Sequence, residues 1–184
     1  MTTYDDAKQI LNEVDRVLQQ VKEEQVDAFC GAILGAEHLF LHSLGREGLV
    51  LRGFAMRLMH LGLAAAVVGD MTTPPIGLGG LLIASSGPGA VKSMAALFEI
   101  THQAGGKVAL LTAEPAAPLA QQADLLLLIP AQTMARAESQ GALQLMGSVY
   151  EQAEWILLDA IVLRLKNATG QTAELVRQRH TNLE

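Results

Sequence analysis

The 184-residue chain has a single cysteine, few aromatic residues and fewer basic than acidic side chains. One cysteine excludes an internal disulfide and a zinc cluster built from cysteines, and it is typical of a protein from a reducing cytosol. Aromatic residues make up 4% of the chain and the formal net charge is −6. A nucleic-acid-binding surface needs a basic face and stacking rings, so we expect a small molecule or another protein as the partner, and no nucleic acid.

Long hydrophobic runs are also missing. The longest strongly apolar region, residues 155–165, is interrupted by Asp159 and Arg164 and is too short to cross a bilayer. Asp5 and Asp6 near the N-terminus are followed by no apolar stretch, unlike the start of a secretory signal peptide. We therefore expect no membrane association and a cytoplasmic location. Half of the residues are apolar and no linker or repeat interrupts the chain, which predicts one well-filled domain over residues 1–184.

Apolar runs that alternate with helical patterns predict the fold. Strands are predicted at residues 37–42, 64–68, 81–84, 107–112 and 124–129. Helices are predicted at residues 5–24, 26–35, 46–60, 88–104, 115–122, 141–166 and 172–178. This alternation is typical of a parallel sheet covered on both faces, so we predict a three-layer, doubly wound α/β fold with five strands. The helix at 141–166 is apolar on nearly every face, which predicts a subunit interface.

Two glycine-rich turns follow predicted strands: SLGREG at residues 43–48 and ASSGPGAVKS at residues 84–93. Glycines let the backbone approach a ligand, and the start of the next helix favours an anion. Because ligands of doubly wound sheets bind beyond the carboxyl ends of the strands, we expect both turns to converge on one phosphate-bearing small molecule. The candidate binding residues are Ser43, Gly45, Arg46, Glu47, Thr72, Thr73, Ser85, Ser86, Gly87, Gly89 and Lys92. The alternatives are turn formation by the serines, loop shaping by the threonines, a solvated lysine, and a helix-surface ion pair for the arginine.

The order of the predicted elements and the two glycine-rich turns resemble the sugar isomerase (SIS) domain. More narrowly, four further motifs resemble its 6-phospho-3-hexuloisomerase branch. They are GFAMRLMHLG at residues 53–62, VVGDMTTP at 67–74, MGSVYEQ at 146–152 and RHTNLE at 179–184. The resemblance implies a flavodoxin-like SIS fold with extra terminal helices, and a homotetramer or dimer whose active sites lie between subunits. It also implies a sugar-phosphate isomerase of carbohydrate metabolism that converts 3-hexulose 6-phosphate into fructose 6-phosphate in the ribulose monophosphate pathway, without a cofactor.

In such a reaction a base removes the proton beside the carbonyl, and an enediolate forms. The position of Glu151 in its motif implies that it is this base, and the position of His180 implies an acid or polarising group supplied by a neighbouring subunit. Without the resemblance, Glu151 is read as a solvated or capping acid and His180 as a mobile tail residue. The other histidines, at positions 38, 42, 60 and 102, lack the paired spacing of a zinc site, so we predict no metal.

The chain departs from the family pattern where phosphate is expected to bind. Glu47 stands where the family has serine, and Pro88, Ala90 and Val91 stand where it has a serine, an acid and a threonine. A carboxylate about 4 Å from a phosphate charge repels it by roughly 4 kcal/mol at an effective dielectric constant of 20. If Glu47 points into the pocket, the usual phosphate site is lost, and if it points away, the remaining donors suffice. Three functions stay open: the isomerase for 3-hexulose 6-phosphate, a non-catalytic or altered-specificity sugar-binding module, and an isomerase for a different phosphosugar.

Overall fold

The computed structural model describes residues 2–133 and 144–183. Its helices are α1 (Thr3–Leu18), α2 (Glu23–Gly35), α3 (Gly45–His60), α4 (Lys92–Gln103), η1 (Ala120–Gln122), α5 (Ser148–Ala168) and α6 (Ala173–Gln178). Its strands are β1 (His38–His42), β2 (Ala65–Val67), β3 (Gly80–Ser85), β4 (Lys107–Thr112) and β5 (Leu125–Leu128).

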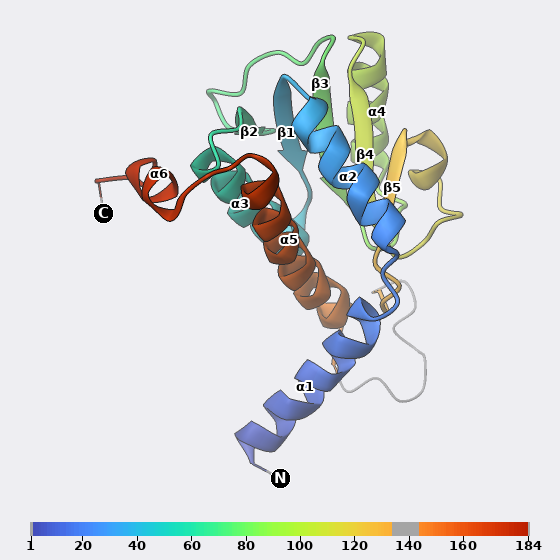
Figure 1. Ribbon diagram of the computed structural model, residues 1–184. Helices are drawn as coiled ribbons and strands as arrows, with labels where there is room; N and C mark the ends of the chain where they lie inside the picture. Colours follow the sequence, from blue (N-terminus) through green and yellow to red (C-terminus); the bar gives the residue numbers. More distant parts are fainter. Residues whose placement is uncertain (1, 134–143, 184) are drawn as a thin grey trace.

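The five strands form one parallel sheet in the order β2-β1-β3-β4-β5 (Figure 1). The predicted doubly wound α/β fold is therefore confirmed. From β1 the chain first adds β2 on one side and then returns to add β3, β4 and β5 on the other side. The strand order thus reverses between β1 and β3, and the carboxyl ends of these two strands are where this class of sheet binds ligands.

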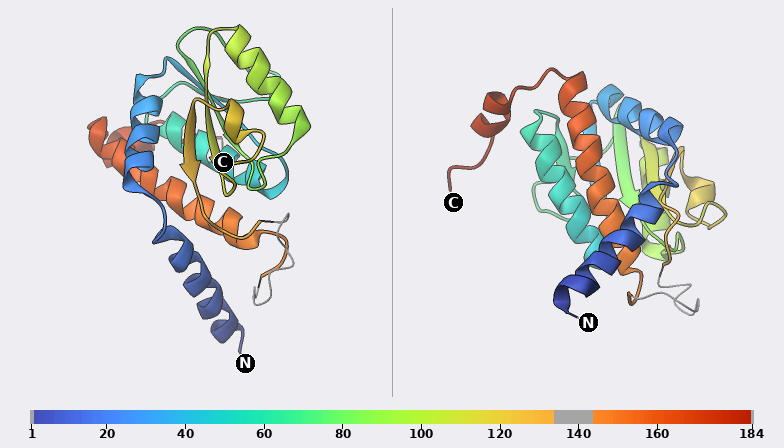
Figure 2. Two further views of the ribbon diagram at one scale, coloured as in Figure 1. Left: turned by 90° about the vertical axis from the view of Figure 1, so that its right-hand side faces the viewer. Right: turned by 60° about the horizontal axis from the view of Figure 1, so that its bottom comes forward.

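Helices cover both faces of the sheet, because side chains alternate between the faces along each strand. On one face Leu41, Ile83 and Leu111 pack in a core shared with α2, α3 and α5, while α1 packs on α5. On the other face Leu82 and Leu110 pack in a smaller core with α4 and η1. Figure 2 shows these two helical layers from the side of the molecule. The central strand β3 is buried along its whole length, which fixes the turn that follows it.

All five predicted strands agree with the structure to within one residue at each end. The first two helices divide earlier than predicted, because α1 ends at Leu18 and α2 already begins at Glu23. The prediction of a helix from residue 88 was wrong: residues 88–91 are not helical, and α4 begins at Lys92. Gly89 has a φ of +65°, a left-handed conformation that interrupts a right-handed helix. The helix predicted at 115–122 is reduced to the short turn η1, which follows Pro115 and Pro118.

The start of the long C-terminal helix was also predicted too early. Residues 141–143 lie outside the described residues, and the helix α5 begins at Ser148. Met146 and Gly147, with φ of 54° and 81°, are both left-handed, so the helix cannot extend back through them. This irregular segment brings residues 146–148 to the carboxyl end of the sheet.

The two terminal helices project from the body of the molecule (Figure 1). In α1 only Val14 and Val17 are buried, whereas Tyr4 and Leu11 are exposed despite their apolar character. Among the described residues, no helix has both the length and the apolar composition that crossing a bilayer requires.

Candidate active site

The two glycine-rich turns lie together at the carboxyl ends of β1 and β3, where they enclose a cavity of about 510 Å³. This volume is within the range of pockets that enclose small molecules. The cavity is lined by Ser43, Leu44, Gly45, Arg46, Glu47, Ser85, Ser86, Gly87, Pro88, Val91, Met94, Thr133, Met146, Gly147, Ser148, Tyr150 and Glu151. The structure thus brings the start of α5 to the two turns and places Glu151 beside them.

Glu47, in the first turn of α3, points into the second glycine-rich turn. The Ser85 hydroxyl donates to Glu47 Oε2 at 2.8 Å, and the Gly87 N–H donates to the two carboxyl oxygens at 3.2 and 3.3 Å. The Ser43 hydroxyl donates to the Ser85 carbonyl at 2.7 Å and so ties the two turns together. The carboxylate of Glu47 therefore lies in the cradle where an anion was expected.

Two buried polar side chains from α5, Tyr150 and Glu154, lie beneath this cradle. The Tyr150 hydroxyl is 3.2 Å from Ser85 Oγ, and one helical turn further on Glu154 is fully buried. Within the described part of the chain, neither carboxyl oxygen of Glu154 has a hydrogen-bond partner of normal geometry. Burial raises the pKa of Glu154 well above its ordinary value, and the Glu47 carboxylate raises it further. Burial therefore favours the neutral, protonated form of Glu154.

Burial also raises the pKa of Glu47, while the hydrogen bonds from Ser85 and Gly87 oppose that shift and nearby Glu151 adds to it. The charge of Glu47 is therefore partly stabilised by the turn and partly penalised by its surroundings. Although these glutamates approach one another, no group of three or more His, Cys, Asp or Glu side chains in residues 2–133 and 144–183 is placed to hold a metal ion.

Glu151, in the first turn of α5, forms an ion pair with Arg46 at the cavity wall. Arg46 Nε lies 2.9 Å from Glu151 Oε2, and the Glu151 side chain is 16% exposed. Arg46 also donates to the Ser148 hydroxyl at 3.4 Å. Burial raises the pKa of Glu151, and the positive charge of Arg46 opposes that shift. A carboxylate with a raised pKa accepts protons more readily near neutral pH, which suits a general base.

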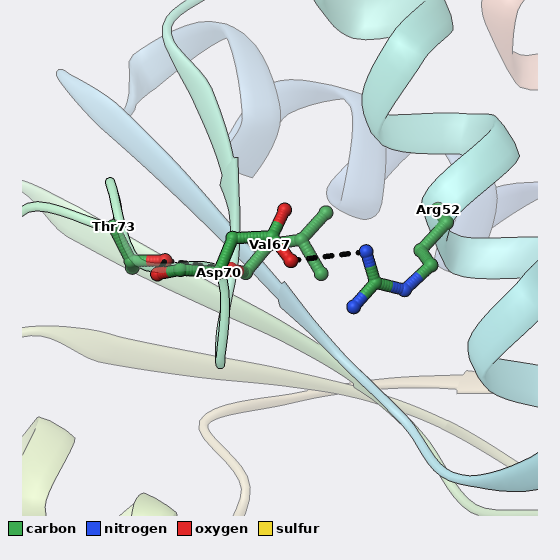
Figure 3. Close-up of polar contacts among 4 residues, drawn as sticks. All are labelled: Arg52, Val67, Asp70 and Thr73. Carbon is green, nitrogen blue, oxygen red and sulfur yellow. Dashed lines mark hydrogen bonds and ion pairs between the residues drawn. The ribbon is translucent and has the colours of Figure 1, made fainter.

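Thr72 and Thr73 lie outside this cavity. They line a second cavity of about 500 Å³ along the β2 edge of the sheet, together with Arg52 and Asp70. Figure 3 shows how this edge is held: the Thr73 hydroxyl lies 2.7 Å from the Val67 carbonyl and 2.8 Å from the Asp70 carbonyl, and Arg52 pairs with Asp70 at 3.0 Å. Within one chain the Thr73 hydroxyl therefore shapes its own loop.

Three other predicted residues are also apart from the cavity in this chain. Gly89 and Lys92 do not line it, and Lys92 is an exposed residue at the start of α4. His180 follows α6 and stacks on His60 with ring centroids 5.3 Å apart. Glu151 is near the start of α5 and His180 is beyond its end. The end of α5 at Ala168 is about 25 Å further along the helix axis than Glu151, so the two side chains lie at opposite ends of that helix.

Three further residues belong to this region although no motif in the sequence marks them as site residues: Tyr150, Glu154 and Thr133. Tyr150 and Glu154 are four residues apart and therefore share one face of α5, which is the face directed at the core. The signal available in the sequence was an acid at position 154 on the apolar side of a helix. Its position beneath a glycine-rich turn depends on tertiary packing and is visible only in the structure.

Comparison with known proteins gives a consistent set of relatives, although no family model matches the chain. A 3-hexulose-6-phosphate isomerase from Bacillus subtilis is 35% identical over 185 aligned positions, which cover 100% of both chains. A protein of the same name from Mycobacterium gastri is 38% identical and covers 95% of this chain and 88% of its own. A crystal structure from Methanococcus jannaschii, for which a molecular function of 3-hexulose-6-phosphate isomerase was inferred, has a TM-score of 0.85 at 25% identity and covers 98% of this chain and 99% of its own.

Proposed function

Since the chain belongs to the 3-hexulose-6-phosphate isomerase family, we propose that it interconverts 3-hexulose 6-phosphate and fructose 6-phosphate through an enediolate. The observation that carries the mechanism is the position of Glu151, a largely enclosed carboxylate in the cavity at the reversal of strand order. That cavity has the size of a small-molecule site and combines one acid–base group with a cation.

In the proposed reaction Glu151 removes the proton from C3 of fructose 6-phosphate. The electron pair of the broken C–H bond forms the C2–C3 double bond, and the C2 carbonyl oxygen becomes an enediolate oxygen. The proton of the C3 hydroxyl passes to the C2 oxygen, and return of a proton to C2 then leaves the carbonyl at C3, which gives the 3-hexulose. Arg46, 2.9 Å from Glu151, keeps the base ionised and carries the positive charge that favours the enediolate.

We propose that His180 assists this step from a neighbouring subunit, as an acid or a polarising group, in a homotetramer or dimer. The length of α5 separates His180 from Glu151 of its own chain, so a second copy is needed to bring the two together. Exposed apolar side chains favour such an assembly: Leu11 on α1 is 62% exposed, and Trp155 and Leu163 on α5 are 46% and 63% exposed.

The activity is tested by a coupled assay. Formaldehyde and ribulose 5-phosphate are converted by a separate hexulose-phosphate synthase, and the formation of fructose 6-phosphate is read downstream. We expect product only when this protein is present, and a loss of rate of about 100-fold or more in Glu151→Gln, because the amide cannot accept the proton. Glu99→Gln, an exposed acid on α4, is the matched control and is expected to retain full activity. A folded protein that gives no product, or an active Glu151→Gln, contradicts the proposal.

A second candidate is a non-catalytic or altered-specificity binding module, and the occupation of the glycine-rich turn by Glu47 favours it. Such a module binds a sugar without turnover, and Glu151→Gln leaves its affinity unchanged. Calorimetric titration of fructose 6-phosphate beside the coupled assay distinguishes the two functions.

A further inference from the structure

The second glycine-rich turn has little hydrogen-bonding capacity left for a ligand. The N–H of Ser86 donates to the Leu111 carbonyl at 3.0 Å, and the N–H of Gly89 donates to the Ser86 carbonyl at 3.0 Å. The N–H of Gly87 and the hydroxyl of Ser85 both donate to Glu47. Pro88 has no N–H. From residue 85 to residue 89, the Ser85 hydroxyl and the Gly87 N–H are therefore taken by the protein's own carboxylate. The Ser86 hydroxyl, which accepts from the Gly89 N–H at 3.1 Å, is the donor that remains in this stretch.

The charges around Glu47 do not compensate for this. Burial raises the pKa of Glu47 and Glu151 raises it further, while Glu47 in turn raises the pKa of Glu154. Tyr150 contributes a neutral hydroxyl, because burial raises its pKa well above the ordinary value. Among the described residues that line the cavity, Arg46 is the one cation, and it is paired with Glu151. A dianionic phosphate entering this turn meets a carboxylate of the same sign on the same donors.

We propose that Glu47 is a specificity-determining residue: its carboxylate occupies the phosphate subsite and lowers the preference of the protein for a phosphorylated over an unphosphorylated ketohexose. The inference rests on the proposed function only in its choice of ligand. A phosphosugar binds when the carboxylate is displaced from Ser85 and Gly87 or is protonated, whereas a neutral sugar hydroxyl donates to the carboxylate where it stands.

Two substitutions separate the charge of Glu47 from its size. Glu47→Ser removes the charge and frees the Ser85 hydroxyl and the Gly87 N–H for phosphate. Glu47→Gln removes the charge but keeps an acceptor oxygen of the same reach, so we expect a smaller effect. Affinities are measured by calorimetry with fructose 6-phosphate, fructose and inorganic phosphate. We expect Glu47→Ser to increase the ratio of the affinity for fructose 6-phosphate to the affinity for fructose by about tenfold or more. The reason is that the Glu47 carboxylate and a phosphate held by the same turn repel each other.

Glu99→Ser is the matched control, because it removes one exposed negative charge from α4 without touching the cavity. Its affinity ratio is expected to equal that of the wild type, which excludes a general effect of net charge. Thermal unfolding of each variant shows that the comparison is made between folded proteins, and Glu47→Gln, which keeps the size of the side chain, remains informative if Glu47→Ser unfolds.

The pH dependence provides a readout that a structural role does not give. Protonation of Glu47 at falling pH removes its charge, so the advantage of Glu47→Ser over the wild type in binding fructose 6-phosphate is expected to shrink as the pH is lowered. The phosphate group of fructose 6-phosphate titrates in the same way in both experiments, so its effect cancels in the ratio of the two proteins' affinities.

Failure of this inference differs from failure of the proposed function. If neither Glu47 variant gains affinity for fructose 6-phosphate relative to fructose, the inference is overturned, whatever the activity. If Glu47→Ser binds the phosphosugar more tightly but no protein turns it over, the inference stands and the isomerase activity fails.

Discussion

At the residue scale, the chemistry of this molecule is concentrated in three glutamates, of which two, Glu47 and Glu154, approach the Ser85 hydroxyl. Glu47 accepts its hydrogen bond, Glu151 faces the cavity with Arg46, and Glu154 is fully buried behind Tyr150. Burial raises the pKa of each carboxyl group, but the accompanying partners differ, so the three acids have different roles. Glu47 occupies the turn, Glu151 is proposed to move the proton, and burial favours the neutral form of Glu154.

The buried Glu154 makes the stability of the protein depend on pH. In the unfolded chain Glu154 releases its proton around the ordinary pKa of 4.5, whereas the folded state keeps this proton to a higher pH. Stability from this group is therefore complete below that pKa and is lost as the pH rises toward the folded pKa, by up to about 1.4 kcal/mol per pH unit. We expect the free energy of unfolding of Glu154→Gln, measured in urea between pH 5 and 8, to fall less steeply with pH than that of the wild type. Glu99→Gln serves as the control, and parallel slopes for Glu154→Gln and the wild type contradict the assignment.

At the element scale, the second glycine-rich turn depends on the left-handed conformation of Gly89. A Cβ at Gly89 would lie 2.5 Å from the Cβ of Ala117, at a φ of +65° that disfavours any side chain. We expect Gly89→Ala to lower the free energy of unfolding by about 2 kcal/mol or more. Gly31→Ala is the matched control, because Gly31 lies within α2 with no atom within 4 Å of its added Cβ. At that position alanine is expected to raise the free energy of unfolding by about 0.5–1 kcal/mol. A Gly89→Ala variant as stable as the wild type would contradict the requirement for glycine in this turn.

The strands were predictable because each is a short apolar run bounded by polar or glycine residues, and buried parallel strands impose this pattern. The starts of α4 and α5 were not, because they are set by left-handed residues such as Gly89 and Met146. Helical propensity gives no warning of these, since the conformation depends on the neighbouring chain. The two glycine-rich turns meet at one cavity, as the sequence predicted, but the orientation of Glu47 depends on the packing of α3 against β3. The location of Thr73 at the β2 edge likewise follows from hydrogen bonds within its loop.

At the scale of the whole molecule, the proposed active site is incomplete in one chain. His180 lies beyond the far end of α5 from Glu151, and apolar side chains on α1 and α5 remain exposed. If the two residues meet between subunits, mixed oligomers restore activity. We expect Glu151→Gln and His180→Ala, each nearly inactive alone, to regain activity when they are unfolded and refolded together, because about a quarter of the sites then combine an intact residue from each chain. Refolding the same proteins separately and mixing them afterwards is the control, and no recovery in the co-refolded sample argues that the residues do not share a site.

The most direct test of the proposed chemistry is solvent exchange into fructose 6-phosphate, followed by proton NMR in D₂O. An enediolate formed by a base leads to deuterium at C3 of fructose 6-phosphate, even without the synthase that supplies the 3-hexulose. We predict that the wild-type protein catalyses loss of the C3 proton signal and that Glu151→Gln does so at least about 100-fold more slowly. A C3 signal that persists with the folded wild-type oligomer, or that disappears equally fast with Glu151→Gln, would contradict the assignment of Glu151 as the base of a sugar-phosphate isomerase.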